Sequence, residues 1–319
     1  MKPPSVIAAL QIFLVVMLVA SLSLVGRFAT ALTRMSRVTT ALHVEKAHLR
    51  GRVFAGSTDG ALQVNGFDAA EAFLNTVDID DGPFFVHVTS ARNVSEPEWC
   101  ELCGLAKDKV AIAFETAPPT ARLLHVLVSE EGWESRRYSL RSDSQLNVDE
   151  LPAILRYDGS MHTSLLLSEG FVSDPVLLRA VFQTSPAPRR RVLDITTVQA
   201  LERAIEAASI QPLFTYFVSG RNPQDGRLWC RYCDRSDIPI VTYYNEYAPV
   251  NATLLRVIVA DSYADWQNPT NPFARQQVVP VSGLPMLARL DATATGIQVH
   301  EYVQFFEERE SLRAFFVGS

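Results

Sequence analysis

The chain has 319 residues, a formal net charge of −6, and 48% hydrophobic and 20% charged residues. These values exclude a collagenous, largely disordered or multi-span membrane protein, and the net negative charge disfavours nucleic acid as the main partner. Four cysteines are too few for a disulfide-stapled secreted scaffold of this length. All four fall in two C-x-x-C pairs, Cys100/Cys103 and Cys230/Cys233, which any functional interpretation must explain.

Residues 5–26 are predicted to form a single transmembrane anchor. No residue from Pro3 to Gly26 is charged, and Ile7–Val25 is nearly continuous apolar sequence, long enough to cross a bilayer as a helix. A cleavable signal peptide is the alternative, because Ala29-Thr-Ala31 offers a small-residue cleavage site. The apolar run exceeds the core of a usual signal peptide, which favours the anchor.

The charges that flank this run predict a cytosolic location for the rest of the protein. Lys2 precedes the run, whereas the juxtamembrane segment that follows it, 27–59, begins with several basic residues, among them Arg27, Arg34, Arg37 and Lys46. The side with more positive charge usually stays in the cytosol. Two sequons, at Asn93 and Asn251, would accept glycans in a lumen. A glycan at Asn93 would crowd Cys100, and a lumenal location remains the alternative.

The rest of the chain is a tandem repeat. Pro83–Ser90 pairs with Pro212–Ser219, and both runs are rich in the β-branched and aromatic residues of strands. Each is followed by a polar loop that ends in Trp-Cys-x-x-Cys, and each copy later contains a Leu-Pro dipeptide. The same motifs in the same order at matched spacing predict two homologous domains, 60–183 and 192–319, joined by an exposed linker, 184–191.

Each copy alternates helix and strand patterns. An amphipathic helix is predicted before the first strand, at Phe67–Leu74 and at Val198–Glu206. A second strand is predicted between the cysteines and the Leu-Pro, at Leu123–Val128 and at Leu254–Val259. Strand, C-x-x-C, helix, strand and a Leu-Pro that opens another strand make up the layout of a thioredoxin-like α/β sandwich.

A C-x-x-C at a strand-to-helix junction is suited to thiol–disulfide exchange. The first cysteine, Cys100 or Cys230, lies at the helix N-terminus, where unpaired N–H groups and the helix dipole favour the thiolate that attacks. The second, Cys103 or Cys233, lies one turn further on and can resolve a mixed disulfide.

Two non-redox explanations of the cysteines are weaker. A zinc ribbon usually separates its pairs by about 15–20 residues, but here Cys103 and Cys230 are 127 positions apart and belong to different repeats. We therefore expect no metal. Inert core cysteines are also disfavoured, because a polar loop precedes both pairs.

Tryptophan and proline recur beside the cysteines. Trp99 and Trp229 directly precede the nucleophiles, where a large flat ring can shield the site and contact a partner protein, although both could be core residues. The Leu151-Pro152 and Leu284-Pro285 dipeptides each open a strand in the same place of the repeat. They are candidates for cis peptide bonds next to the cysteines, rather than ordinary turn prolines.

These motifs resemble the thioredoxin domain-containing protein 17 family of small disulfide reductases. The second copy is the better match, in Tyr216–Asn222, Gly226–Cys233, Trp266–Arg275 and Val281–Pro285. The resemblance implies reduction of disulfides in protein substrates, with electrons from a flavin-dependent thioredoxin reductase and no cofactor bound to the chain itself. The family's W-C-P-D-C is altered in both copies, so its redox potential does not carry over.

The two sites are predicted to differ in reactivity. Glu98 and Glu101 flank Cys100 and disfavour its thiolate, whereas the two basic neighbours of Cys230, Arg227 and Arg231, favour one. Cys230 is therefore expected to be the more acidic and faster thiol.

The sequence thus predicts a membrane-anchored protein-disulfide reductase. A lumenal oxidase or isomerase could use the same residues in the opposite direction. A redox-inert adaptor could use the tandem folds only for binding, although a binding platform has no need of four cysteines.

Overall fold

The computed structural model describes residues 62–91, 99–136, 146–159, 162–183, 190–207, 211–293 and 296–318. The predicted anchor and juxtamembrane segment lie outside these ranges. Within them, none of the helices combines the length and the apolar character that a bilayer crossing requires.

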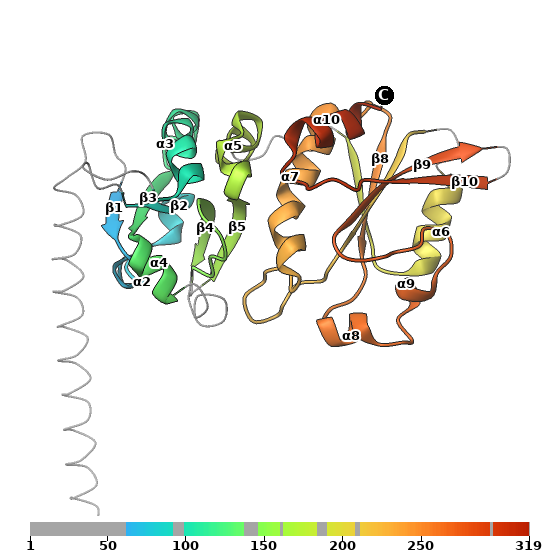
Figure 1. Ribbon diagram of the computed structural model, residues 1–319, viewed down its shortest axis with the longest axis horizontal. Helices are drawn as coiled ribbons and strands as arrows, with labels where there is room; N and C mark the ends of the chain where they lie inside the picture. Colours follow the sequence, from blue (N-terminus) through green and yellow to red (C-terminus); the bar gives the residue numbers. More distant parts are fainter. Residues whose placement is uncertain are drawn as a thin grey trace, which may run out of the picture. The chain divides into compact units, whose positions relative to one another are not determined.

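The first repeat forms a five-stranded sheet in the order β1-β3-β2-β4-β5 (Figure 1). Strands β1, β3 and β2 are parallel, and β4 and β5 are antiparallel additions. Its elements are β1 (Leu62–Asn65), α2 (Phe67–Leu74), η1 (Ile79–Asp81), β2 (Phe84–Ser90), α3 (Glu101–Phe114), β3 (Arg122–Val128), α4 (Glu130–Arg136), β4 (Ala153–Gly159), β5 (His162–Ser168), η2 (Glu169–Ser173) and α5 (Pro175–Phe182).

The second repeat forms a sheet with the same topology, β6-β8-β7-β9-β10. Its elements are β6 (Arg191–Ile195), α6 (Val198–Ala207), β7 (Leu213–Val218), α7 (Arg231–Tyr247), β8 (Thr253–Ile258), α8 (Tyr263–Gln267), α9 (Pro272–Arg275), β9 (Met286–Thr293), β10 (Gly296–Glu301) and α10 (Arg309–Val317). The tandem thioredoxin-like α/β architecture predicted from the motifs is therefore confirmed. The predicted helices and strands correspond to α2, α6, β2, β7, β3 and β8.

The central strand β7 has two apolar faces because its side chains alternate. Phe214, Tyr216 and Val218 face the layer formed by α7 and α10, while Leu213 and Phe217 face the layer that includes α6. A strand covered on both faces is a nearly continuous apolar run instead of an alternation of apolar and polar residues.

The cores of the two repeats meet in one continuous apolar cluster. Phe171 and Leu177 of the first repeat belong to the same cluster as Ile240 and Tyr243 of α7. Helix α7 packs against β5 and α5, beside which it lies in Figure 1. The cysteine helix of the second repeat is thus enclosed between its own sheet and the edge of the preceding repeat.

Candidate active sites

The second repeat places Cys230 at the N-cap of α7. Its backbone is extended rather than helical (φ −86°, ψ 111°), as expected of a cap residue. The Cys230 Sγ accepts a hydrogen bond from the backbone N–H of Cys233 at 3.4 Å. The Cys230 N–H donates to the buried Ser219 Oγ at 3.2 Å, which ties the cap to the end of β7.

This position makes Cys230 the acidic member of the pair. A hydrogen bond from the Cys233 side chain, supported by the backbone N–H groups of Cys233 and Tyr232, lowers the pKa of Cys230 to about 7. Burial raises the pKa of Cys233, which is 0% exposed, whereas Cys230 is half-buried. Cys230 is therefore the accessible cysteine that forms a thiolate, and Cys233 is the buried cysteine that keeps its proton.

The cause of this acidity differs from the one expected from sequence. Arg227 does not face the sulfur, because its Nε donates to the carboxylate of Asp234 at 2.6 Å in a largely buried ion pair. Arg231 donates to the hydroxyl of its neighbour Tyr232 at 2.7 Å. Both guanidinium groups are held elsewhere, so the cap hydrogen bonds, and not flanking charge, favour the thiolate.

The tryptophan and the Leu-Pro dipeptide meet at the same site. The indole N–H of Trp229 donates to the carbonyl of Ala260 at 2.9 Å, and its half-buried ring makes an edge contact with Tyr263. The Leu284-Pro285 bond is cis, as the repeat suggested, and the carbonyl of Leu284 lies 3.8 Å from the Cys230 Sγ.

The first repeat has the same cap geometry, but its two cysteines are in a different redox state. Cys100 is the N-cap of α3, and its Sγ accepts from the Cys103 N–H at 3.3 Å. Here the two cysteines form a disulfide, whereas Cys230 and Cys233 are free thiols. The Leu151-Pro152 bond is also cis. The indole N–H of Trp99 is buried without a hydrogen-bond partner among the described residues, unlike that of Trp229.

The repeats also differ in the polar groups buried on the central strands, which the sequence interpretation did not single out. In the first repeat, His87 of β2 is paired in register with His125 of β3, and their Nδ1 atoms are 3.2 Å apart. Burial, with smaller contributions from the charges of His125 and Lys107, lowers the pKa of His87 to about 3. The pair is therefore neutral at physiological pH.

In the second repeat the same two positions are Tyr216 and Arg256, which are also register partners. The Tyr216 hydroxyl lies 2.9 Å from Ser236 Oγ. Arg256 makes two hydrogen bonds to Asp237, at 2.7 and 2.8 Å. The sequence does contain a signal for these residues. When the strands of the two repeats are aligned, a polar residue interrupts each apolar run at the same place.

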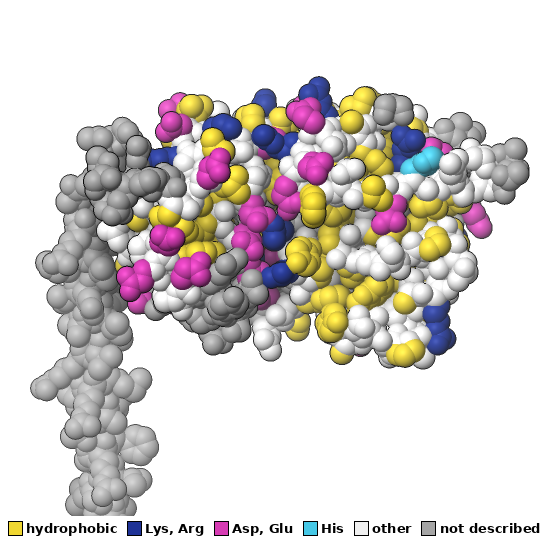
Figure 2. Space-filling view, viewed as in Figure 1, with side chains coloured by type: hydrophobic (Ala, Val, Ile, Leu, Met, Phe, Trp, Pro, Cys, Tyr) yellow, Lys and Arg dark blue, Asp and Glu magenta, His cyan; other side chains and the backbone are white. Residues whose placement is uncertain are grey.

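The first repeat also contributes to the surroundings of the second site. The Arg227 Nη1 donates to the carbonyl of Asn147 at 3.0 Å, and the charges of Asp149 and Glu150 act on Arg231. Acidic and basic side chains accordingly lie beside one another in the middle of the face shown in Figure 2. A small cavity of about 230 Å³, lined by both repeats, reaches Trp229.

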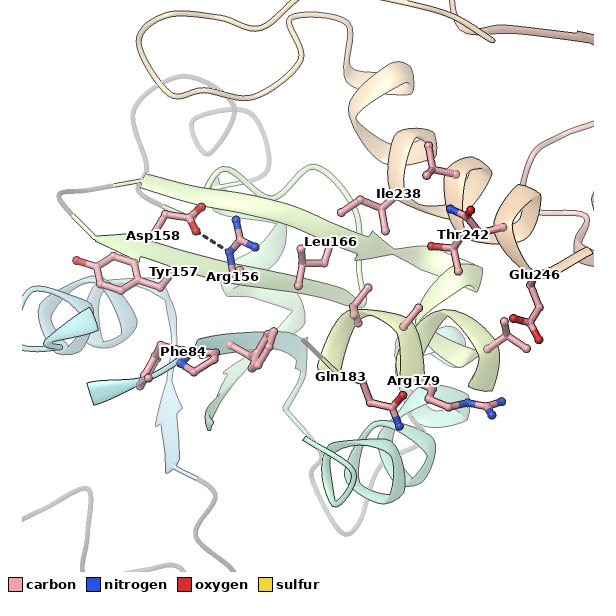
Figure 3. Close-up of a pocket in the computed structure, with 18 of the residues that line it drawn as sticks. Phe84, Arg156, Tyr157, Asp158, Leu166, Arg179, Gln183, Ile238, Thr242 and Glu246 are labelled. Carbon is pink, nitrogen blue, oxygen red and sulfur yellow. Dashed lines mark hydrogen bonds and ion pairs between the residues drawn. The ribbon is translucent and has the colours of Figure 1, made fainter. Parts of the chain in front are cut away.

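A second, larger cavity lies away from the cysteines. It has a volume of about 1020 Å³ and is lined by Phe84 and Leu166 of the first repeat and by Ile238 and Thr242 of α7 (Figure 3). No cysteine lines it, so its walls offer no thiol chemistry. The thiols at the helix caps thus lie outside this cavity.

Comparison with known proteins agrees with this geometry. A family model described as "Thioredoxin domain-containing protein 17-like, thioredoxin domain" matches residues 63–184 and, a second time, residues 194–305. The chain belongs to this family. Among solved structures it is similar to the first two thioredoxin domains of Naumovozyma dairenensis Eps1p, at 10% identity and a TM-score of 0.26, over 73% of this chain and 90% of that one. No curated protein matches the chain.

Proposed function

We propose that this protein is a protein-disulfide reductase that works through its Trp-Cys-x-x-Cys sites. The observation that carries the proposal is the pairing at the start of α7 of an accessible Cys230, whose pKa is lowered to about 7, with a buried Cys233, whose pKa is raised. Family membership supports a thiol-redox role of this general kind.

The reaction proceeds by two exchanges. The Cys230 thiolate attacks one sulfur of a substrate disulfide, forms a mixed disulfide and releases the other sulfur as a thiolate. Cys233 then loses its proton and attacks the Cys230 Sγ, which forms the Cys230–Cys233 disulfide and releases the second substrate thiolate. The substrate gains two electrons, and the protein is left oxidised by two electrons.

The neighbours of the cysteines are proposed to bind the substrate. The carbonyl of Leu284 lies beside the Cys230 Sγ, so an extended peptide can approach along the Leu284-Pro285 segment. The ring of Trp229 is half-buried and offers an apolar face next to the sulfur. In the first repeat, Trp99 and the Leu151-Pro152 segment are proposed to serve Cys100 and Cys103 in the same way.

A thioredoxin reductase is the proposed electron donor, because a dithiol consumed in each cycle must be regenerated and the proposed chemistry uses no cofactor bound to the chain. We further propose that residues 5–26 anchor the protein in a membrane, with the catalytic domains in the cytosol. Protease digestion of intact vesicles tests this: resistance of the domains, or glycans on Asn93 or Asn251, would place them in a lumen.

Insulin-disulfide reduction with dithiothreitol tests the activity. We expect Cys230→Ser to remove most of the rate, Cys100→Ser to remove less, and the double variant to match the uncatalysed reaction. If the unaltered protein is no faster than the double variant, the protein is a binding adaptor and not a reductase.

A further inference from the structure

The junction between the two repeats is a specific interface in which side chains of α7 make polar contacts with the first repeat. Arg235 forms an ion pair with Glu169 of η2, and the hydroxyl of Tyr243 donates to Asp174 Oδ2 at 2.5 Å. Thr242 of α7 faces the cavity that β5 and α5 complete. The cysteine helix of the second repeat is therefore covered by the last strand and the last helix of the repeat before it.

No helix or strand of the described residues covers the equivalent face of α3 in this way. Counting from the second cysteine of each pair, Leu105 corresponds to Arg235 and Ile112 corresponds to Thr242. Leu105 is 55% exposed and Ile112 is 66% exposed, and Leu102 beside them is 38% exposed. The α3 face that corresponds to the buried face of α7 thus carries two exposed apolar residues, Leu105 and Ile112, with the exposed Asp108 and Lys109 between them.

The complementary half of the interface is exposed on the second repeat. There, β10 and α10 occupy the places that β5 and α5 occupy in the first repeat. Around them Val303 is 78% exposed, Phe305 is 77% exposed and Val317 is 53% exposed. A surface equivalent to the one that receives α7 is therefore also apolar and open to solvent.

Exposed large apolar side chains are frequent on these two faces. Of the eleven in the described residues, six lie on or beside them: Leu105, Ile112, Ile297, Val303, Phe305 and Val317. Single exposed apolar residues are common on protein surfaces, but such clustering on two matching faces marks an interaction surface.

We propose that copies of this chain associate head to tail, with α3 of one copy packed against the β10–α10 face of the next. This contact between two chains has the same arrangement as the packing that joins the first and second repeats within one chain. Because the two surfaces differ, the interface is heterologous, and it generates a ring or an open string of copies rather than a closed two-fold dimer.

Two variants of the full chain separate the two faces. Leu105→Gln/Ile112→Lys removes the α3 stripe, and Val303→Asp/Phe305→Ser removes the opposite face. Val250→Glu, at an 83% exposed apolar residue on neither face, is the matched control. Sedimentation velocity in detergent, over a concentration series, gives the apparent dissociation constant of each.

We expect the unaltered chain and the control to associate, and each face variant to associate at least tenfold more weakly. An equimolar mixture of the two variants should form a species of two chains and nothing larger, because only one intact pair of faces remains. Three results would overturn the proposal: a monomeric unaltered chain, a Val303→Asp/Phe305→Ser variant that still dimerises through α3 alone, or association that neither variant weakens.

Discussion

The two repeats place a C-x-x-C at the same point of the same fold, yet surround it differently. Cys100 and Cys103 are joined in a disulfide, in the repeat whose central strands carry a neutral histidine pair; Cys230 and Cys233 are free thiols, in the repeat whose central strands carry a tyrosine and an arginine that pairs with Asp237. Helix α7 is also held by the neighbouring repeat, while the matching face of α3 is exposed.

The fold places the attacking sulfur at the same point in both repeats. The two copies are distinguished by the buried side chains on their central strands. Both first cysteines cap a helix and accept a hydrogen bond from the N–H of the second. What differs is the charge and polarity of a few buried side chains on the central strands. The following experiments test whether those differences matter, in order of decreasing expected effect.

The ion pair of the second repeat should be the most costly to break. Arg256→Met leaves the Asp237 carboxylate, only 14% exposed, without its two hydrogen bonds. We expect a loss of about 3 kcal/mol in the free energy of unfolding, measured by denaturant titration. The double variant Arg256→Met/Asp237→Leu should recover most of the lost stability. Lys107 is the first-repeat residue that corresponds to Asp237, and Lys107→Met should have little effect. Equal losses in the single and double variants would contradict this.

The two attacking thiols share the cap hydrogen bond but should still differ in acidity, because a carboxylate, Glu101, directly follows Cys100, whereas Arg231 directly follows Cys230. We expect iodoacetamide alkylation of Cys230, in a Cys100→Ser/Cys103→Ser background, to rise with pH through about 7. At pH 7 a thiol with that pKa carries about 50-fold more thiolate than one with the ordinary value near 9. The reference is Cys100 in a Cys230→Ser/Cys233→Ser background. The same apparent pKa in both would remove the distinction between the sites.

The histidine pair should make the first repeat sensitive to acid. The unfolded chain protonates His87 below pH 6.5, but the folded chain does so only near pH 3. Unfolding therefore takes up a proton between these values, and the free energy of unfolding falls by about 1.4 kcal/mol per pH unit, or about 2 kcal/mol at pH 5. His87→Phe should flatten this dependence, whereas a substitution of the exposed His162 (His162→Gln) should leave it unchanged.

The contact between the repeats should contribute least. Tyr243→Phe removes the hydroxyl that donates to Asp174, at an expected cost of about 1.5 kcal/mol, the lower end for hydrogen bonds to charged groups. Thermal unfolding measures the loss. Tyr247→Phe, one turn along the same helix, is the control. An equal effect of the two variants would mean that the bond to Asp174 adds nothing.

The sequence could predict the fold because its signals are local. The apolar runs that became β2 and β7, the Trp-Cys-x-x-Cys motifs and the Leu-Pro dipeptides recur at nearly constant spacing, and their order already indicates a thioredoxin-like sandwich. The edge strands β1, β6, β5 and β10 were not predicted, because short strands at the edge of a sheet depend on their partners more than on their own residues.

The cause of the acidity of Cys230 could not be read from the sequence. Arg227 and Arg231 are its near neighbours along the chain, but side-chain direction decides whether a charge acts on a sulfur. Arg227 turns to Asp234 and to the carbonyl of Asn147 in the other repeat. A contact between residues 80 positions apart has no local signature.

The sequence by itself determined that there are two copies, each with a dithiol pair at a helix start, a tryptophan just before it and a later Leu-Pro dipeptide. These follow from patterns along the chain. Only the tertiary structure decided which buried groups lie behind each pair, that α7 is covered while α3 is not, and that cap hydrogen bonds rather than arginines favour the Cys230 thiolate. Those features arise from residues distant in sequence that packing brings within hydrogen-bond distance.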